Sequence, residues 1–257
     1  MFSDTHAHLT DEAFRGRIDE VVSSFRAAGV GLVINIGYDL KSSEESAYIA
    51  QKHPEIYFTA GLHPTDGEPA TEANLSAVRR LAAMPKCVGI GEIGLDYHYG
   101  GDREEQKKNF LAQLSLAEEL KLPVSVHARD CTADMLEIMK GWMKRLPAAV
   151  LHCYSMGAEA AKLFVRYGCH FAFGGAITFK NNRQIYEVAK VVPKDRLLTE
   201  TDCPYMAPVP FRGEVNEPKY IPLVTEKLAG LYGTTVEEIS EILLSNAKKV
   251  FNIRDIK

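Results

Sequence analysis

The chain alternates between short apolar or β-branched runs and longer segments in which apolar residues recur at helical spacing. Eight short runs predict strands, at residues 2–4, 32–36, 56–60, 88–90, 123–126, 149–151, 169–173 and 196–198. Helical spacing predicts helices near residues 11–28, 42–53, 72–83, 103–120, 131–146, 157–167, 183–192, 218–232 and 236–250. Strands that alternate with helices form parallel βαβ units. We therefore expect an α/β protein with one domain over residues 1–257, a single-domain (β/α)8 TIM barrel whose active site lies at the C-terminal ends of the strands.

Local sequence also indicates where helices begin and end. Residues 42–45 and 235–238 both fit the S/T-x-x-E capping box, in which a hydroxyl and an acid close the first helical turn. Gly168 follows a helical run and suits the left-handed residue that commonly ends a helix. Three irregular stretches, 61–71, 94–103 and 202–217, each follow a strand, so we expect them at the active-site end.

Composition narrows the class of protein. A hydrophobic fraction of 46% predicts a core of ordinary globular size. The net charge of −4 provides no general basic field, so a polyanionic substrate needs local arginines or bound cations. The five cysteines form no CxxC pair, which argues against a zinc knuckle and indicates buried free thiols in a reducing compartment. The chain shows neither a signal-peptide pattern nor about 18 consecutive apolar residues, and we expect a cytoplasmic protein that does not associate with membranes.

Residues of metal-binding type stand at the ends of the predicted strands. His6 and His8 end the first one, and residues i and i+2 of a strand point to the same side, so both imidazoles can bind one cation. Glu92 follows the fourth strand between glycines, which allow close backbone approach. Its two carboxylate oxygens can bridge two cations, although a solvated loop acid is the alternative interpretation.

Later strands add more residues of the same kind. His127 and His152 each follow an apolar run; either alone would be read as a core histidine, but together they indicate metal ligands. Asp202 follows the eighth strand, which adjoins the first when a barrel closes, so it can contact a metal and its bound water. Glu200 shares its side of the chain, as an additional ligand or as a partner of the ligands, and Asp96 is a further candidate partner.

The collection favours two divalent cations. Several histidines with two or three carboxylates exceed the needs of one tetrahedral ion, and ligands without thiolate suit Mg, Mn, Zn, Fe, Co or Ni. Two ions roughly 3.5–4 Å apart, bridged by Glu92, would lower the pKa of a shared water and stabilise charge on an attacked phosphoryl or acyl group. Asp202 is the predicted general base for that water.

Other residues at this end suggest substrate contacts. His63 ends the third strand, and we expect it to contact substrate or to act as a catalytic acid. Arg129 and Arg212 carry guanidinium groups that suit phosphate oxygens, with a surface salt bridge as the alternative for each. His170 begins a strand at the opposite end of the barrel, and we expect it to be structural.

These motifs together resemble the TatD family of metal-dependent deoxyribonucleases, among the amidohydrolase-like TIM barrels. The matching stretches run in family order over essentially the whole chain: residues 4–8 (DTHAH), 61–64 (GLHP), 89–96 (GIGEIGLD), 126–129 (VHAR), 152–155 (HCYS), 200–205 (ETDCPY) and 212–218 (RGEVNEP). The resemblance implies two metal ions. One ion is held by His6, His8, Glu92 and Asp202, and the other by Glu92, His127 and His152. The resemblance also implies phosphodiester hydrolysis, often of DNA from an end.

The first hypothesis is therefore a two-metal phosphodiesterase of 3′-5′ exonuclease type that acts on single-stranded or frayed DNA. A metal-bridging hydroxide attacks phosphorus, Asp202 takes the proton, Arg129 or Arg212 holds the phosphate, and His63 assists the leaving group. The alternative, which the resemblance also implies, is a metal-dependent ester or amide hydrolase such as a D-aminoacyl-tRNA deacylase. A non-catalytic metal-binding barrel is the third hypothesis, and it would be marked by missing ligands, whereas here every ligand position is filled.

Overall fold

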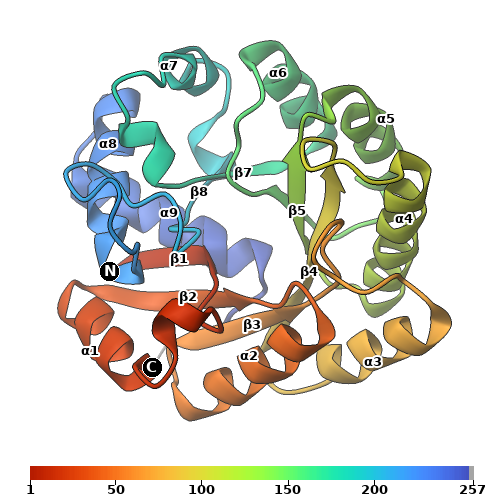
Figure 1. The fold of residues 1–257 in the computed structure, drawn as a ribbon. Helices are drawn as coiled ribbons and strands as arrows, with labels where there is room; N and C mark the ends of the chain where they lie inside the picture. The colour runs from red at the N-terminus through yellow and green to blue at the C-terminus, as the bar shows by residue number, and fades with distance from the viewer. Residues whose placement is uncertain (255–257) are drawn as a thin grey trace.

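The computed structural model describes residues 1–254 and forms a (β/α)8 barrel (Figure 1). Eight parallel strands stand side by side in sequence order, and helices surround them. The strands are β1 Phe2–Ala7, β2 Val30–Ile36, β3 Ile56–Ala60, β4 Cys87–Asp96, β5 Val124–Arg129, β6 Ala149–Leu151, β7 His170–Phe173 and β8 Leu197–Thr199. The predicted fold is confirmed, while residues 255–257 of the predicted domain lie outside the described residues.

The helices follow the strands as the periodicity predicts. They are α1 Ile18–Ala27, α2 Leu40–Lys52, α3 Glu72–Ala82, α4 Arg103–Leu120, α5 Thr132–Trp142, α6 Ala158–Tyr167, α7 Gln184–Ala189, α8 Ile221–Tyr232 and α9 Val236–Val250. Short 3-10 turns add η1 Glu12–Phe14, η2 Gly175–Thr178, η3 Lys194–Arg196 and η4 Pro218–Tyr220. None of the described helices combines the length and the apolar character that a bilayer crossing requires.

Several element boundaries differ from the prediction. β1 continues to Ala7 rather than ending at residue 4, which places His6 inside the strand. β4 continues through Asp96, so Glu92 lies within a strand rather than in a loop, because pairing with β5 persists to the end of both strands. β5 extends to Arg129 for the same reason, which places His127 inside the strand. The first helix begins only at Ile18, since the separate turn η1 occupies the start of the predicted segment.

The predicted helix ends are partly confirmed. The capping box at residues 42–45 is wrong, because α2 begins earlier and Asp39 caps it by accepting a hydrogen bond from Ser42 N at 2.6 Å. At residues 235–238 the first half of the box is present, since Thr235 Oγ1 accepts a hydrogen bond from Glu238 N at 3.1 Å. Gly168 ends α6 with a φ of 96°, as predicted.

Alternate strand residues separate the barrel interior from the layer under the helices. Leu32 of β2 packs in a cluster that reaches Val250 of α9, whereas Val33 packs in a second cluster with residues of α1 and α2. α9 lies against the strand starts, where Asn246 Nδ2 donates a hydrogen bond to the carbonyl of Leu197 at 2.9 Å. Hydrophobic packing therefore fills the end of the barrel at which the strands begin.

The barrel closes between β1 and β8 through buried side chains as well as backbone. Ala7 and Cys203 form an isolated parallel bridge beyond the end of β8. Asp4, fully buried in β1, accepts hydrogen bonds from Thr201 N at 3.0 Å and from Thr201 Oγ1 at 2.6 Å. These bonds join residues 197 positions apart. They fix the segment that carries Asp202 against the first strand.

The described residues also confirm the prediction of free thiols. All five cysteines are unpaired in the structure. Three of them are buried as expected, but Cys87 and Cys153 are only partly buried.

Candidate metal centre

The predicted metal ligands converge at the C-terminal end of the barrel. They lie in β1, β4 and β5 or within three residues after the end of β1, β6 or β8, and five of the six are buried. The six residues are His6, His8, Glu92, His127, His152 and Asp202. Parallel strands bring these distant positions to one rim.

Glu92 lies between two groups of histidines. Its Oε2 atom is 3.5 Å from His6 Nε2 and 3.6 Å from His8 Nε2. Its Oε1 atom is 2.8 Å from His152 Nε2 and 2.9 Å from His127 Nδ1. Each carboxylate oxygen therefore faces a different pair of the predicted ligands, which is the geometry a bridging ligand needs.

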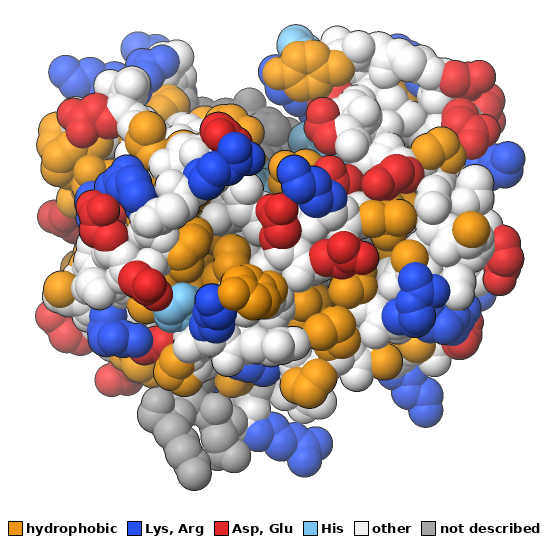
Figure 2. Space-filling view, turned by 60° about the horizontal axis from the view of Figure 1, so that its bottom comes forward, with side chains coloured by type: hydrophobic (Ala, Val, Ile, Leu, Met, Phe, Trp, Pro, Cys, Tyr) orange, Lys and Arg blue, Asp and Glu red, His pale blue; other side chains and the backbone are white. Residues whose placement is uncertain are grey.

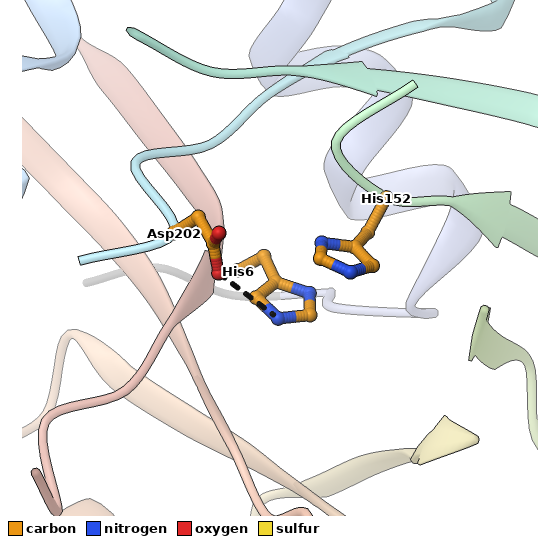
Figure 3. Close-up of side chains that lie close together, drawn as sticks. All are labelled: His6, His152 and Asp202. Atoms are coloured by element: carbon orange, nitrogen blue, oxygen red, sulfur yellow. Dashed lines mark ion pairs between the residues drawn. The ribbon is translucent and has the colours of Figure 1, made fainter. Parts of the chain in front are cut away.

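Asp202 completes the first group. Its Oδ1 atom is 3.3 Å from His8 Nε2 and 3.8 Å from His6 Nε2. The His6 ring also stacks on that of His152, with ring centroids 4.0 Å apart, so the two groups touch (Figure 3). Asp202 has a φ of 56°, in the left-handed region that residues other than glycine seldom adopt and that is concentrated at functional sites.

The facing atoms have the chemistry of a cation site. His6 Nε2 and His8 Nε2 are 3.2 Å apart, and carboxylate oxygens face both, so their lone pairs repel unless a proton or a cation lies between them. Three groups bring one ligand atom per residue within 4.8 Å of each other: His6, His8 and Glu92; His6, His152 and Asp202; and His63, Glu92 and His127. Nitrogen and oxygen ligands without thiolate fit divalent ions of intermediate hardness.

Electrostatics keep both carboxylates ionised and one imidazole neutral. Burial opposes ionisation of Glu92, but the surrounding histidines hold its pKa well below the usual range. Burial opposes ionisation of Asp202 as well, and the hydrogen bond with His8 nevertheless lowers its pKa. Burial lowers the pKa of His6 to about 3, so this imidazole is neutral and its lone pair is available at neutral pH.

Asp96 lies behind His127, on the side of the ring that faces away from Glu92. His127 Nε2 is 2.9 Å from Asp96 Oδ2 while its Nδ1 faces Glu92. Despite burial, hydrogen bonds with Asp96 and Glu92 raise the pKa of His127 to about 9. Gln106 fixes Asp96 in turn, since its amide exchanges two hydrogen bonds of 2.8 Å with the Asp96 backbone. The imidazole is thus oriented by a carboxylate that is itself held in place.

Glu200 occupies the corresponding place behind His152. The side chain is fully buried, accepts a hydrogen bond from Cys153 N, and has an oxygen 3.8 Å from His152 Nδ1. Burial, reinforced by the charge of Asp202, raises the pKa of Glu200 well above its usual value. The structure therefore places Glu200 beside a predicted ligand rather than among the facing ligand atoms.

A cavity of about 750 Å³ opens above the predicted ligands, and His63 and Arg129 both line it. His63 Nε2 is 3.7 Å from Glu92 Oε1, and its Nδ1 is 2.9 Å from Asp66 Oδ2. His63 thus joins the groups that face Glu92, and a carboxylate orients it from the other side. Asp66 was not among the residues predicted from the sequence, and its spacing of three residues from His63 was the available signal.

Arg212 does not lie with the other predicted site residues. Among the described residues it lies outside the cavity lining, and its guanidinium carbon is 4.4 Å from the centre of the Phe179 ring. The segment that follows Arg212 contacts the loop of Asp202 instead. Asn216, fully buried, donates hydrogen bonds from Nδ2 to the carbonyls of Thr201 at 2.8 Å and Tyr205 at 2.7 Å. This segment braces the loop that carries Asp202.

Comparison with known proteins identifies the family of the chain. The family model described as TatD related DNase matches residues 3–252. The chain is 39% identical to the uncharacterized metal-dependent hydrolase YabD of Bacillus subtilis, over 98% of this chain and 100% of that protein. It is 31% identical to the 3′-5′ ssDNA/RNA exonuclease TatD of Escherichia coli, over 97% of this chain and 98% of that protein. The crystal structure of YJJV, a TatD homologue from Escherichia coli, superposes with a TM-score of 0.91 at 29% identity and 98% coverage of both chains. The chain therefore belongs to the TatD family and is a metal-dependent hydrolase.

Proposed function

We propose that this chain is a two-metal phosphodiesterase that shortens single-stranded or frayed DNA from its 3′ end. The observation that carries the proposal is Glu92, whose two oxygens face different pairs of the predicted ligands at distances of 2.8–3.6 Å. A carboxylate in this position suits the bridging ligand of a two-ion site. The name of the Escherichia coli relative, a 3′-5′ ssDNA/RNA exonuclease, supports a nucleic acid substrate.

We assign the ions to the two faces of Glu92. His6, His8, Glu92 and Asp202 would hold one ion, and Glu92, His127 and His152 the other. When bound, divalent ions lower the pKa of water and stabilise negative charge on a phosphoryl group. The ionised state of Glu92 follows from the histidines around it, which hold its pKa low.

The remaining residues have roles in proton transfer and positioning. Asp202, ionised and at the base of the cavity, accepts the proton of the attacking water. His63, oriented by Asp66, stands on the opposite side of Glu92 and donates a proton to the leaving 3′ oxygen. Arg129 reaches the same cavity and binds the non-bridging phosphate oxygens. A phosphate contact of Arg212 stays a prediction from the sequence, because this side chain is not among the residues that line the cavity.

A single-stranded DNA oligonucleotide labelled at its 5′ end tests the proposal directly. With Mg²⁺ or Mn²⁺ we expect stepwise shortening from the unlabelled end, which chelator abolishes. Asp202→Asn should lower kcat by about 10²- to 10⁴-fold, the usual cost of losing a general base. Asp19→Asn is the matched control, because the Asp19 side chain is 97% exposed on α1 and should leave the rate unchanged.

Two further arms separate the rival functions. The rate at which an RNA oligonucleotide of the same sequence is cleaved, compared with the rate for DNA, gives the preference for ribose or deoxyribose. If metal is bound but neither oligonucleotide is cleaved with any divalent ion, the phosphodiesterase proposal is wrong. Hydrolysis of a D-aminoacyl-tRNA ester under the same conditions would then identify the metal-dependent ester hydrolase instead.

A further inference from the structure

The cavity above the metal centre has few cations for a site that receives a polyanion. Arg129 is the only Lys or Arg among the described residues that line it, whereas Asp11 and Asp66 add negative charge to the lining. On the face that Figure 2 shows, Lys and Arg side chains are interspersed with Asp and Glu rather than gathered in a basic band. Affinity from phosphate contacts requires several cations along the backbone. Much of the affinity beyond the metal centre must therefore come from another interaction.

Aromatic side chains supply a candidate for that interaction. Tyr99 and Tyr205 line the cavity and are 72% and 54% exposed, and the half-buried Tyr38 lines it as well. The Tyr205 ring centroid is 6.3 Å from that of His8, one of the predicted ligands. The guanidinium carbon of Arg129 lies 4.9 Å from the Tyr99 ring centroid, and Tyr99 nevertheless remains largely exposed to solvent. Exposed rings beside a groove are the surfaces on which unpaired bases stack.

The two exposed tyrosines stand on opposite sides of the metal centre. Tyr99 follows β4 and Tyr205 follows β8. In a barrel whose eight strands run in sequence order, strands four positions apart face each other across the axis. A phosphodiester seated on the metal centre carries one nucleoside on each side of the phosphorus. Its two bases would then point in different directions, one toward each ring.

We propose that Tyr99 and Tyr205 are stacking surfaces for the two bases that flank the scissile phosphate. The inference rests on the proposed phosphodiesterase function and specifies its substrate as unpaired nucleotides. In a duplex the penultimate base is covered on both faces by neighbouring bases, and pairing holds the terminal base in the same stack, so the two bases cannot turn apart to reach the two rings. A single strand or a frayed end exposes these faces. The pair of rings therefore selects against paired DNA without reading its sequence.

Abasic oligonucleotides separate stacking from phosphate chemistry. We would measure kcat/KM on a single-stranded oligonucleotide and on two copies, in which a tetrahydrofuran residue replaces either the 3′-terminal or the penultimate nucleotide. The wild type should discriminate against each abasic copy by about 5- to 100-fold, the worth of one base–aromatic contact. Tyr99→Leu should lose discrimination at one of the two positions and Tyr205→Leu at the other, with the effect mainly in KM. Tyr99→Phe and Tyr205→Phe retain the ring and should retain the discrimination.

Tyr186→Leu is the matched control, because Tyr186 is 51% exposed on α7 and lies outside the cavity lining. It should discriminate as the wild type does. The inference is overturned if the wild type cleaves the intact and abasic oligonucleotides equally well, or if both Leu variants still discriminate at both positions. In those cases cleavage of the intact oligonucleotide continues, so the proposed function stands. If the wild type cleaves no oligonucleotide at all, the proposed function fails and the inference fails with it.

Discussion

His170 makes the stability of this barrel depend on pH. It begins β7, at the end of the barrel opposite the metal centre, and is 7% exposed. Its Nδ1 atom has no hydrogen-bond partner among the described residues, and its Nε2 is 3.4 Å from Arg196 Nη1. Burial, aided by the charge of Arg196, lowers the pKa of His170 from 6.5 to about 4. We predict that His170→Gln removes part of the stability loss that the wild type suffers on acidification.

The size of the effect follows from the two pKa values of His170. Below about pH 6.5 the unfolded chain takes up a proton that the folded chain does not accept until about pH 4. The unfolded state then binds more protons, so the free energy of unfolding falls as the pH falls. The full difference is about 3.4 kcal/mol, because one pKa unit corresponds to about 1.36 kcal/mol. About 2 kcal/mol of it develops between about pH 7.5 and 5.

Urea unfolding in chelator, followed by circular dichroism at both pH values, measures this difference. Between about pH 7.5 and 5 the free energy of unfolding should fall by about 2 kcal/mol more in the wild type than in His170→Gln. Other histidines such as His6 titrate in both proteins, so the comparison isolates one side chain. Equal losses in the two proteins would refute the reasoning. The result also gives the lowest pH at which the pH dependence of the reaction rate can be assigned to Asp202, the proposed general base. Below that pH, unfolding lowers the rate as well.

Three further predictions concern the site and the seam of the barrel. Asp96→Asn should weaken Mn²⁺ binding by about 10- to 100-fold, because Asp96 orients His127, and an unchanged Kd in titration calorimetry would contradict this. Thr201→Val should lower the free energy of unfolding by about 1.5–3 kcal/mol at pH 8, because the buried hydroxyl bonds to Asp4, whereas Thr201→Ser should keep most of it. KM for a single-stranded oligonucleotide should rise with salt with a log–log slope below about 1.5, since Arg129 is the one Lys or Arg of residues 1–254 that lines the cavity. A slope of about 3 or more would show that phosphate contacts outside the cavity dominate.

The fold and the convergence of the predicted ligands follow from signals that the sequence carries locally. Strand and helix periods alternate along the chain, and this alternation suffices to predict parallel strands. His6 and His152 lie next to the end of a strand and Glu92 lies in the C-terminal half of β4, and a parallel barrel brings such positions together at one end. Their proximity can therefore be inferred without knowing any contact between them.

The end of β4 could not be predicted, because its glycines resemble a loop signal. Gly91 and Gly94 have φ values of 125° and 151°, and a Cβ atom at Gly94 would collide with the carbonyl oxygen of His127. The glycines are thus required for close pairing of β4 with β5, which sets Glu92 beside His127. The contacts of Asp66 and of the exposed tyrosines were missed for another reason. Such residues form no periodic pattern, and only the folded chain shows what they face.

The seam between β1 and β8 also governs when the metal centre forms during protein synthesis. At roughly 5–20 residues per second, about 10–40 s separate the translation of His6 from that of Asp202. During that interval β1 is present, but Asp4 lacks Thr201, the residue that ties the first strand to the last. A nascent chain that ends before Thr201 would carry five of the six predicted ligands without a closed barrel to hold them. The metal centre is therefore among the last features to be assembled, and its formation reports that the barrel has closed.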